Sequence, residues 1–87
     1  MAYTVADMRV EMGRLTQVMM AKNAEYLHRE QELEQLYRDD PVLLKARRDD
    51  DYRLNKAGNT AKSCAVLVTA LASVIAAEVA YVEHQRR

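Results

Sequence analysis

The chain has 87 residues, and its 13 basic and 13 acidic side chains balance to a formal net charge of zero. This length fits a single domain over residues 1-87, and the absence of Trp and Phe leaves few bulky residues to fill a core. We therefore expect a solitary monomer to be only marginally stable. A balanced charge supplies no overall field for nucleic acid or anionic lipid, so such partners would have to be recognised locally.

A first helix is predicted over residues 5-38. Thr4 followed three residues later by Asp7 is typical of a capping box, which marks a helix N-terminus. After it, apolar residues recur at spacings of three and four, as on one face of a helix. This face consists of Met8, Met12, Leu15 and Met19 and continues through Lys22, Tyr26, Arg29, Leu33 and Leu36.

A corner at 39-41 and a second helix over 41-85 follow. Asp40 can cap the second helix, because Pro41 suits the first helical turn. A second face with spacings of three and four consists of Leu54, Ala57, Ala61, Cys64, Val68, Leu71, Ile75, Glu78 and Val82. Gly58 leaves an alternative open, since a break there would let Asn59 or Thr60 cap a third helix.

The predicted fold class is all-α: an antiparallel hairpin of two long helices, or of three if the second breaks near Gly58, assembling into a helical bundle. If the chain folds back at the corner, residues whose numbers sum to about 80 face each other. This register brings Arg29 near Asp51. The charged residues from 45 to 53 are expected to form a solvated helical surface.

Residues 64-77 carry no charge and are apolar on nearly every side of a helix. One partner helix covers only one stripe of such a segment, so a further partner must cover the rest. We predict an interaction surface made of Val66, Val74, Val79, Glu78, Tyr81 and, on the first helix, the methionine Met20.

Residues 64-82 also have the length of a membrane span. Against insertion stands Glu78, because a carboxylate costs a few kcal/mol inside the bilayer. Alanine, serine and threonine also take the place of leucine in much of the segment. We favour packing on protein and keep a membrane-inserted C-terminal helix as the alternative.

Catalytic, metal and cofactor sites are not expected. His28 and His84 lack a second ligand at metal-binding spacing, and Cys64 has no nearby base. The aspartates at 49-51 are consecutive, whereas a calcium loop needs acidic residues at alternate positions and a glycine. The sequence therefore predicts no enzyme, no cofactor and no small-molecule substrate.

Nucleic-acid binding is the third hypothesis, and it depends on two small basic clusters. Lys45, Arg47 and Arg48 precede three aspartates, which cancel their field within a Debye length. The other cluster, at 84-87, holds two arginines at the chain terminus. An accessory role on nucleic acid is therefore the least favoured prediction.

The corner Asp40-Pro41-Val42-Leu43-Leu44 resembles the turn in needle subunits of type III secretion systems, which are helical hairpins of similar length. Five residues carry this resemblance. The alanine-rich second helix and the charged stretch from Arg47 to Asp51 depart from the pattern. We therefore assign no family from it.

The predicted function is that of a non-enzymatic protein-protein interaction module. It would act as a subunit of a homo-oligomeric assembly or as a small chaperone or adaptor for another helical protein. The single cysteine and the absence of a basic segment followed by an apolar block near the start favour a cytoplasmic location. The membrane alternative predicts a membrane-associated location instead.

Overall fold

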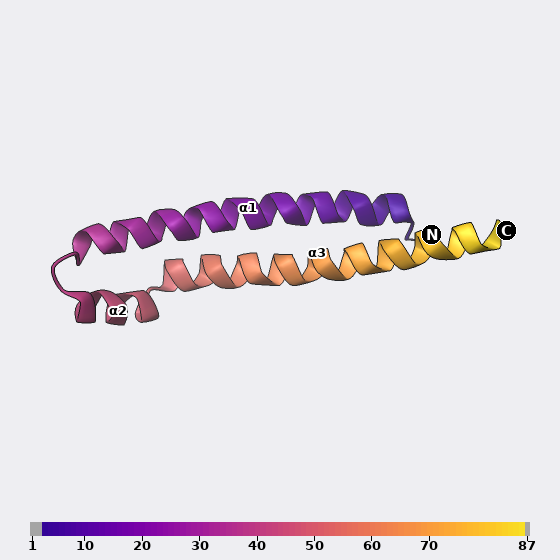
Figure 1. Cartoon of the computed structure of the whole chain (residues 1–87). Helices are drawn as coiled ribbons and strands as arrows, with labels where there is room; N and C mark the ends of the chain where they lie inside the picture. The colour runs from indigo at the N-terminus through magenta and orange to yellow at the C-terminus, as the bar shows by residue number, and fades with distance from the viewer. Residues whose placement is uncertain (1–2, 87) are drawn as a thin grey trace.

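The chain folds into three helices, described over residues 3–86 by a computed structural model: α1 (Val5–Leu36), α2 (Pro41–Asp50) and α3 (Tyr52–Gln85). The long helices α1 and α3 run antiparallel and lie side by side, and short α2 sits at the turn that joins them (Figure 1). The molecule is a rod with extents of 66 × 19 × 16 Å. The predicted all-α helical hairpin is confirmed.

The capping box predicted for the first helix is present. The backbone N–H of Asp7 donates to Thr4 Oγ1 at 3.1 Å, and the N–H of Thr4 donates to Asp7 Oδ2 at 3.0 Å. These reciprocal bonds satisfy two groups that the helix start would otherwise leave free. The helix ends at Leu36, two residues before the predicted end, and the N–H of Tyr37 closes its last turn on Leu33 O.

Asp40 caps the helix that follows the corner, as predicted. The carboxylate of Asp40 accepts a bond from the N–H of Leu43 at 3.0 Å, and Pro41 is the first residue of α2. Proline is suited to this position, because its fixed φ fits the helix and its missing N–H would have had no helical partner.

The prediction of one continuous helix over 41-85 is wrong, and so is the alternative of a break near Gly58. The break lies at Asp51, whose backbone is extended at φ −75° and ψ 111°. Its carboxylate caps α3 by accepting from the N–H of Leu54 at 2.8 Å. The side chain of Asn55 donates to the carbonyl of Asp49 at 2.9 Å, which gives this carbonyl a partner at the end of α2.

The core is a single seam between α1 and α3, with small residues at its centre. Gly58 lies inside α3, where a Cβ would come within 3.2 Å of the ring of Tyr26 on α1. This glycine therefore permits a close approach of the two helices. The buried residues are Leu15 and Leu33 from α1 and Leu54, Ala57, Ala61, Cys64 and Ile75 from α3.

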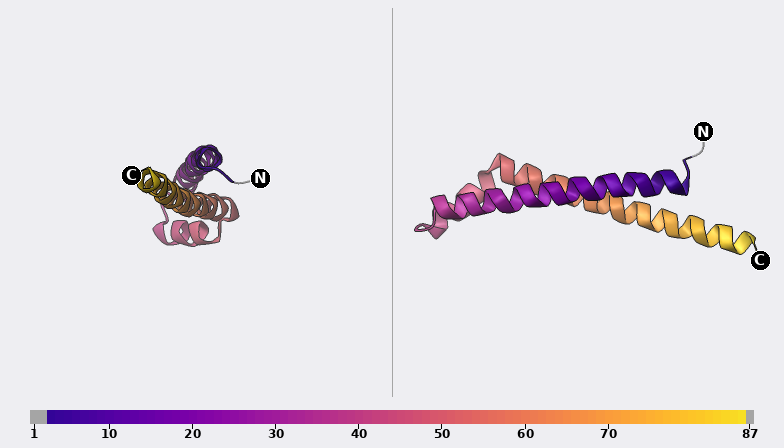
Figure 2. Two further views of the ribbon diagram at one scale, coloured as in Figure 1. Left: turned by 90° about the vertical axis from the view of Figure 1, so that its right-hand side faces the viewer. Right: turned by 90° about the horizontal axis from the view of Figure 1, so that it is seen from above.

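The seam stops at Ile75, although α3 continues to Gln85. The C-terminal turns of α3 extend past the start of α1 (Figure 1), and the two helices diverge toward this end of the rod (Figure 2). Every described residue after Ile75 is exposed. The molecule thus has a closed end at the α1–α2 turn and an open end where the termini lie.

Candidate interaction surface

The outer face of α3 is an apolar surface that the hairpin leaves uncovered. We define it by Val66, Ala70, Val74, Ala77 and Tyr81, which recur at spacings of four, four, three and four and therefore share one side of the helix. Val66 is 68% exposed, Val74 45% and Tyr81 62%. No charged residue lies between Lys62 and Glu78.

The inner face of the same segment packs against α1. Cys64 and Ile75 are buried, and Val68 and Leu71 are half-buried. These residues alternate by three and four, as the seam was predicted to do. One helix therefore presents a covered apolar stripe and an uncovered one, because α1 spans only part of its circumference.

The predicted interaction residues are all exposed, but they do not form one surface. Val66, Val74 and Tyr81 lie on the outer face, and Glu78 borders it. Val79 is exposed as well, but it follows Ile75 by four residues and therefore lies on a different side of α3 from the outer face. It is 36% exposed because the seam has ended at Ile75.

Met20 lies on α1 and is separate from the residues of α3. It is 59% exposed. In the register that joins Arg29 to Asp51, Met20 is level with Thr60, before the apolar segment of α3 begins. It also directly follows Met19 of the seam, so its side chain turns about 100° away from α3.

The part of α1 that runs alongside the apolar segment of α3 carries charged side chains. Arg14 contacts Glu11 through a 2.6 Å ion pair, and this partner lowers the pKa of Glu11. By the same register, Arg9, Glu11 and Arg14 are level with residues 66-71 of α3. Arg9 and Arg14 are exposed and Glu11 is half-buried, so charged side chains border the apolar segment on the side of α1.

Helix α3 is long and apolar enough to cross a membrane by length and composition. It contains an 18-residue window with a mean hydropathy of 2.1, and most residues of that window are exposed. A core helix of a soluble protein can reach such a value, but it would be covered by the rest of its fold.

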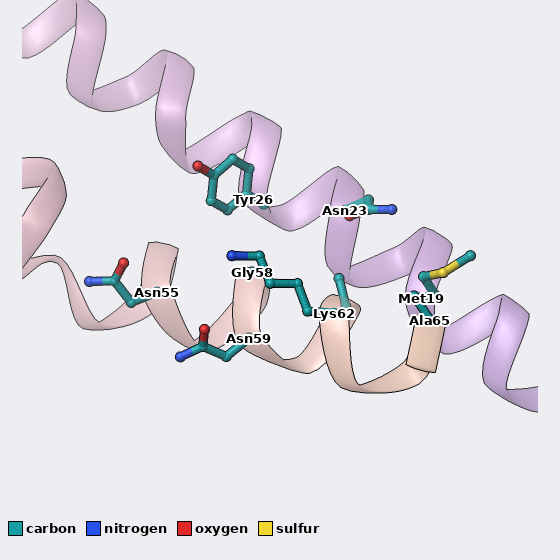
Figure 3. A pocket seen from close by; sticks show the side chains of 9 residues that line it. Met19, Asn23, Tyr26, Asn55, Gly58, Asn59, Lys62 and Ala65 are labelled. Carbon is teal, nitrogen blue, oxygen red and sulfur yellow. The ribbon is translucent and has the colours of Figure 1, made fainter. Parts of the chain in front are cut away.

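A shallow groove of about 440 Å³ lies between α1 and α3 near Gly58. Figure 3 shows Tyr26 of α1 opposite Gly58, with the side chains of Asn55, Asn59 and Lys62 along α3. The polar side chains of the lining are thus three amides, the phenol of Tyr26 and one ammonium group. The full lining is Met19, Asn23, Tyr26, Asn55, Gly58, Asn59, Ala61, Lys62 and Ala65.

The closed end holds the half-buried ion pairs of the fold. Arg29 on α1 donates to both carboxylate oxygens of Asp51, with the shortest contact at 2.8 Å, and also contacts Glu32 at 3.2 Å. These bonds from Arg29 are the main cause of a lowered pKa of Asp51. Arg48 of α2 reaches Glu30 of α1 at 2.8 Å. The predicted proximity of Arg29 and Asp51 is confirmed.

One feature of this end, the helix cap at Asp51, was not predicted from the sequence. The aspartates at 49-51 were expected to form a solvated helical face, but Asp51 serves as a cap and binds Arg29. An aspartate three residues before a buried leucine was the available signal for that cap. Within residues 3–86, no group of three His, Cys, Asp or Glu side chains is placed to hold a metal ion.

The fold and the surface define a class: an all-α helical hairpin with one uncovered apolar helix face. Comparisons with models of protein families, with curated proteins and with solved structures found no match. What the chain does must therefore be inferred from its own geometry.

Proposed function

We propose that this chain is a non-enzymatic helical interaction module that assembles with further copies of itself through the outer face of α3. One observation carries the proposal: a segment that is uncharged between Lys62 and Glu78 is packed on its α1 side and exposed on the opposite side. An apolar face of this length in a hydrophilic chain is typical of a surface that protein contacts cover.

The energy available on this face is sufficient to matter. Full burial of a valine or leucine side chain contributes about 1.5–3 kcal/mol. Val66 and Val74 on this face, with the neighbouring Leu67, would thus supply several kcal/mol beyond what the hairpin obtains from its own seam. Because a chain of this size has a small core, assembly would also stabilise the fold itself.

The hairpin geometry favours protein over lipid as the covering partner. Arg9, Glu11 and Arg14 run alongside the apolar segment of α3, so the hairpin could not enter a bilayer as a unit without taking these charges with it. Each charge near the bilayer centre costs about 2.5–3.5 kcal/mol on insertion scales. Insertion of α3 alone would require it to part from α1 and expose the seam.

The test is the dissociation constant of matched variants, measured by sedimentation equilibrium without detergent. Val66→Glu combined with Val74→Glu places two charges on the outer face and should make the chain monomeric. Thr69→Glu is the control, because Thr69 is exposed on α3 but does not belong to that face. Equal association of both variants would overturn the proposal, and a wild type that stays monomeric at all concentrations would do the same.

Membrane association through α3 is the second candidate, favoured by the exposed window of mean hydropathy 2.1. It predicts that the wild type floats with neutral phosphatidylcholine vesicles in a density gradient. It also predicts that Glu78→Leu strengthens flotation, because the substitution removes the one charge within the segment. The assembly proposal predicts that the chain remains below the vesicles.

A further inference from the structure

A single residue, Asp51, separates α2 from α3. Its φ of −75° lies close to the helical value, and only its ψ of 111° departs from it. Rotation about one backbone bond of this residue therefore decides between a bend and a continuous helix. In the structure the bend is present, and α2 lies out of line with α3 (Figures 1 and 2).

A helix that continued through this position would carry a charge into the core. The buried residues Leu54, Ala57, Ala61 and Cys64 alternate by three and four along α3. The same alternation, continued backward by four, reaches Asp50. Without the break, the carboxylate of Asp50 would therefore occupy the next position of the seam.

The side of α1 that such a helix would meet does not suit a carboxylate. In the register that joins Arg29 to Asp51, residue 50 comes within one turn of Leu33, which is only 3% exposed. Arg29 already binds Asp51 and Glu32. Burial of a carboxylate without a partner of its own is costly, so the charge of Asp50 opposes a straight helix.

The bend removes this charge from the seam. Asp50 is exposed in the structure, and α2 rests on α1 through Arg48, which binds Glu30 at 2.8 Å. Leu44, one turn before Arg48, is half-buried. Within α2, all of which the structure describes, no residue is buried. Few contacts would therefore be lost if α2 left this position.

The corner is long enough for a straight arrangement as well. In the same register Leu36 is level with residue 44, so Pro41 would lie three residues further along, about 4.5 Å. With about 9 Å between the helix axes, the corner would have to span about 10 Å. The five Cα–Cα steps from Leu36 to Pro41 reach about 17 Å, so the chain can join the helices in either arrangement.

We infer that the bend at Asp51 is a conformational device controlled by the charge of Asp50. With the charged carboxylate at position 50, α2 folds out of the line of α3 and binds α1 through Arg48. Without that charge, Asp51 becomes helical, and α2 and α3 join into one helix. The inference concerns the closed end, and it does not depend on what covers the outer face of α3.

Amide hydrogen exchange, measured by nuclear magnetic resonance on the full chain, tests the inference. The N–H groups of Tyr52 and Arg53 precede the first backbone bond of α3, which runs from Asn55 N–H to Asp51 O. In a continuous helix they would donate to the carbonyls four residues earlier. Asp50→Ala should therefore slow their exchange at least about tenfold. It should also move the Cα chemical shift of Asp51 to the range of helical residues.

Asp49→Ala is the matched control. It removes the same charge from the preceding exposed residue, whose side chain lies about 100° away around the helix. The amides of Tyr52 and Arg53 should then exchange within about twofold of the wild-type rate. Equal slowing in both variants, or no slowing in Asp50→Ala, would overturn the inference.

Arg48→Ala separates the charge of Asp50 from the docking of α2. It removes the ion pair with Glu30 and keeps the carboxylate at position 50, so α2 should loosen without joining α3. The amides of Tyr52 and Arg53 should exchange as in wild type. Slowing as large as that in Asp50→Ala would overturn the inference, because the contact of α2 with α1 would then hold the bend.

Discussion

The closed and open ends of the rod are stabilised by different means. At the closed end, Arg29 binds Asp51 and Arg48 binds Glu30, both at 2.8 Å, and buried Leu33 and Leu54 lie in the adjoining seam. At the open end, α3 continues past the seam with its apolar side chains exposed. The comparison teaches that contacts within the chain specify the hairpin at the closed end, while at the open end the hairpin leaves apolar side chains of α3 uncovered.

The largest difference should appear when leucines of the two regions are truncated. Leu54→Ala, at a residue only 2% exposed, should lower the free energy of unfolding by about 2–5 kcal/mol. Leu67→Ala, on the exposed side of α3, should change monomer stability by less than about 0.5 kcal/mol. Urea denaturation followed by circular dichroism at low concentration measures both. Similar losses of unfolding free energy in the two variants would contradict the difference described between the two regions.

Asp51 should contribute more to the free energy of unfolding than an ordinary surface carboxylate does, because it caps α3 and also binds Arg29. Asp51→Ala removes both interactions and should cost about 1–2 kcal/mol. Asp51→Asn keeps a capping oxygen but loses the charge, so a smaller loss is expected. The two variants, compared in the same denaturation experiment, would refute this assignment if they were equally stable.

Acid should weaken the closed end through the same residue. Bonds from Arg29 lower the pKa of Asp51 below its ordinary value of 3.8. An unfolded chain therefore takes up the proton first, so this contribution is present above pH 3.8 and is lost as the pH falls through the lower folded-state pKa. Asp51→Asn should show a shallower decline of Tm below that pH than wild type. Identical acid profiles would exclude the contribution.

The smallest effect concerns the two glycines. Gly13 has open space where a Cβ would lie, so Gly13→Ala should stabilise the chain by about 0.5–1 kcal/mol. At Gly58 the added methyl group would meet the ring of Tyr26 at 3.2 Å, so Gly58→Ala should gain less or lose stability. Equal gains in thermal unfolding would show that the helices do not approach closely there.

Much of the fold followed from local patterns. The spacings of three and four located both seams, and Thr4, Asp40 and Pro41 located two helix starts, because these signals act within a few residues of the chain. The opposite charges of Arg29 and Asp51 agreed with the register of the hairpin. Such features are predictable since period, capping and charge pairing are written in the sequence itself.

The remaining features depend on contacts between distant segments. The charges from 45 to 53 suit a continuous helix by their spacing, and the break at Asp51 wins because its carboxylate bonds both Leu54 N–H and Arg29. Gly58 was a possible break by propensity, but it lies inside α3, close to the ring of Tyr26 on α1. Val79 was grouped with Val66 and Val74 because one partner helix covers only one stripe of α3, although its spacing of four from Ile75 places it on a different side from those two valines.

The central claim is that protein covers the outer face of α3, and the molar mass of the wild type tests it most directly. Light scattering coupled to size exclusion, on chain purified without detergent, should give twice the chain mass of 10.0 kDa at high concentration. The mass should fall toward that of the single chain on dilution. A mass of one chain at every concentration, or recovery only in detergent, would contradict the account.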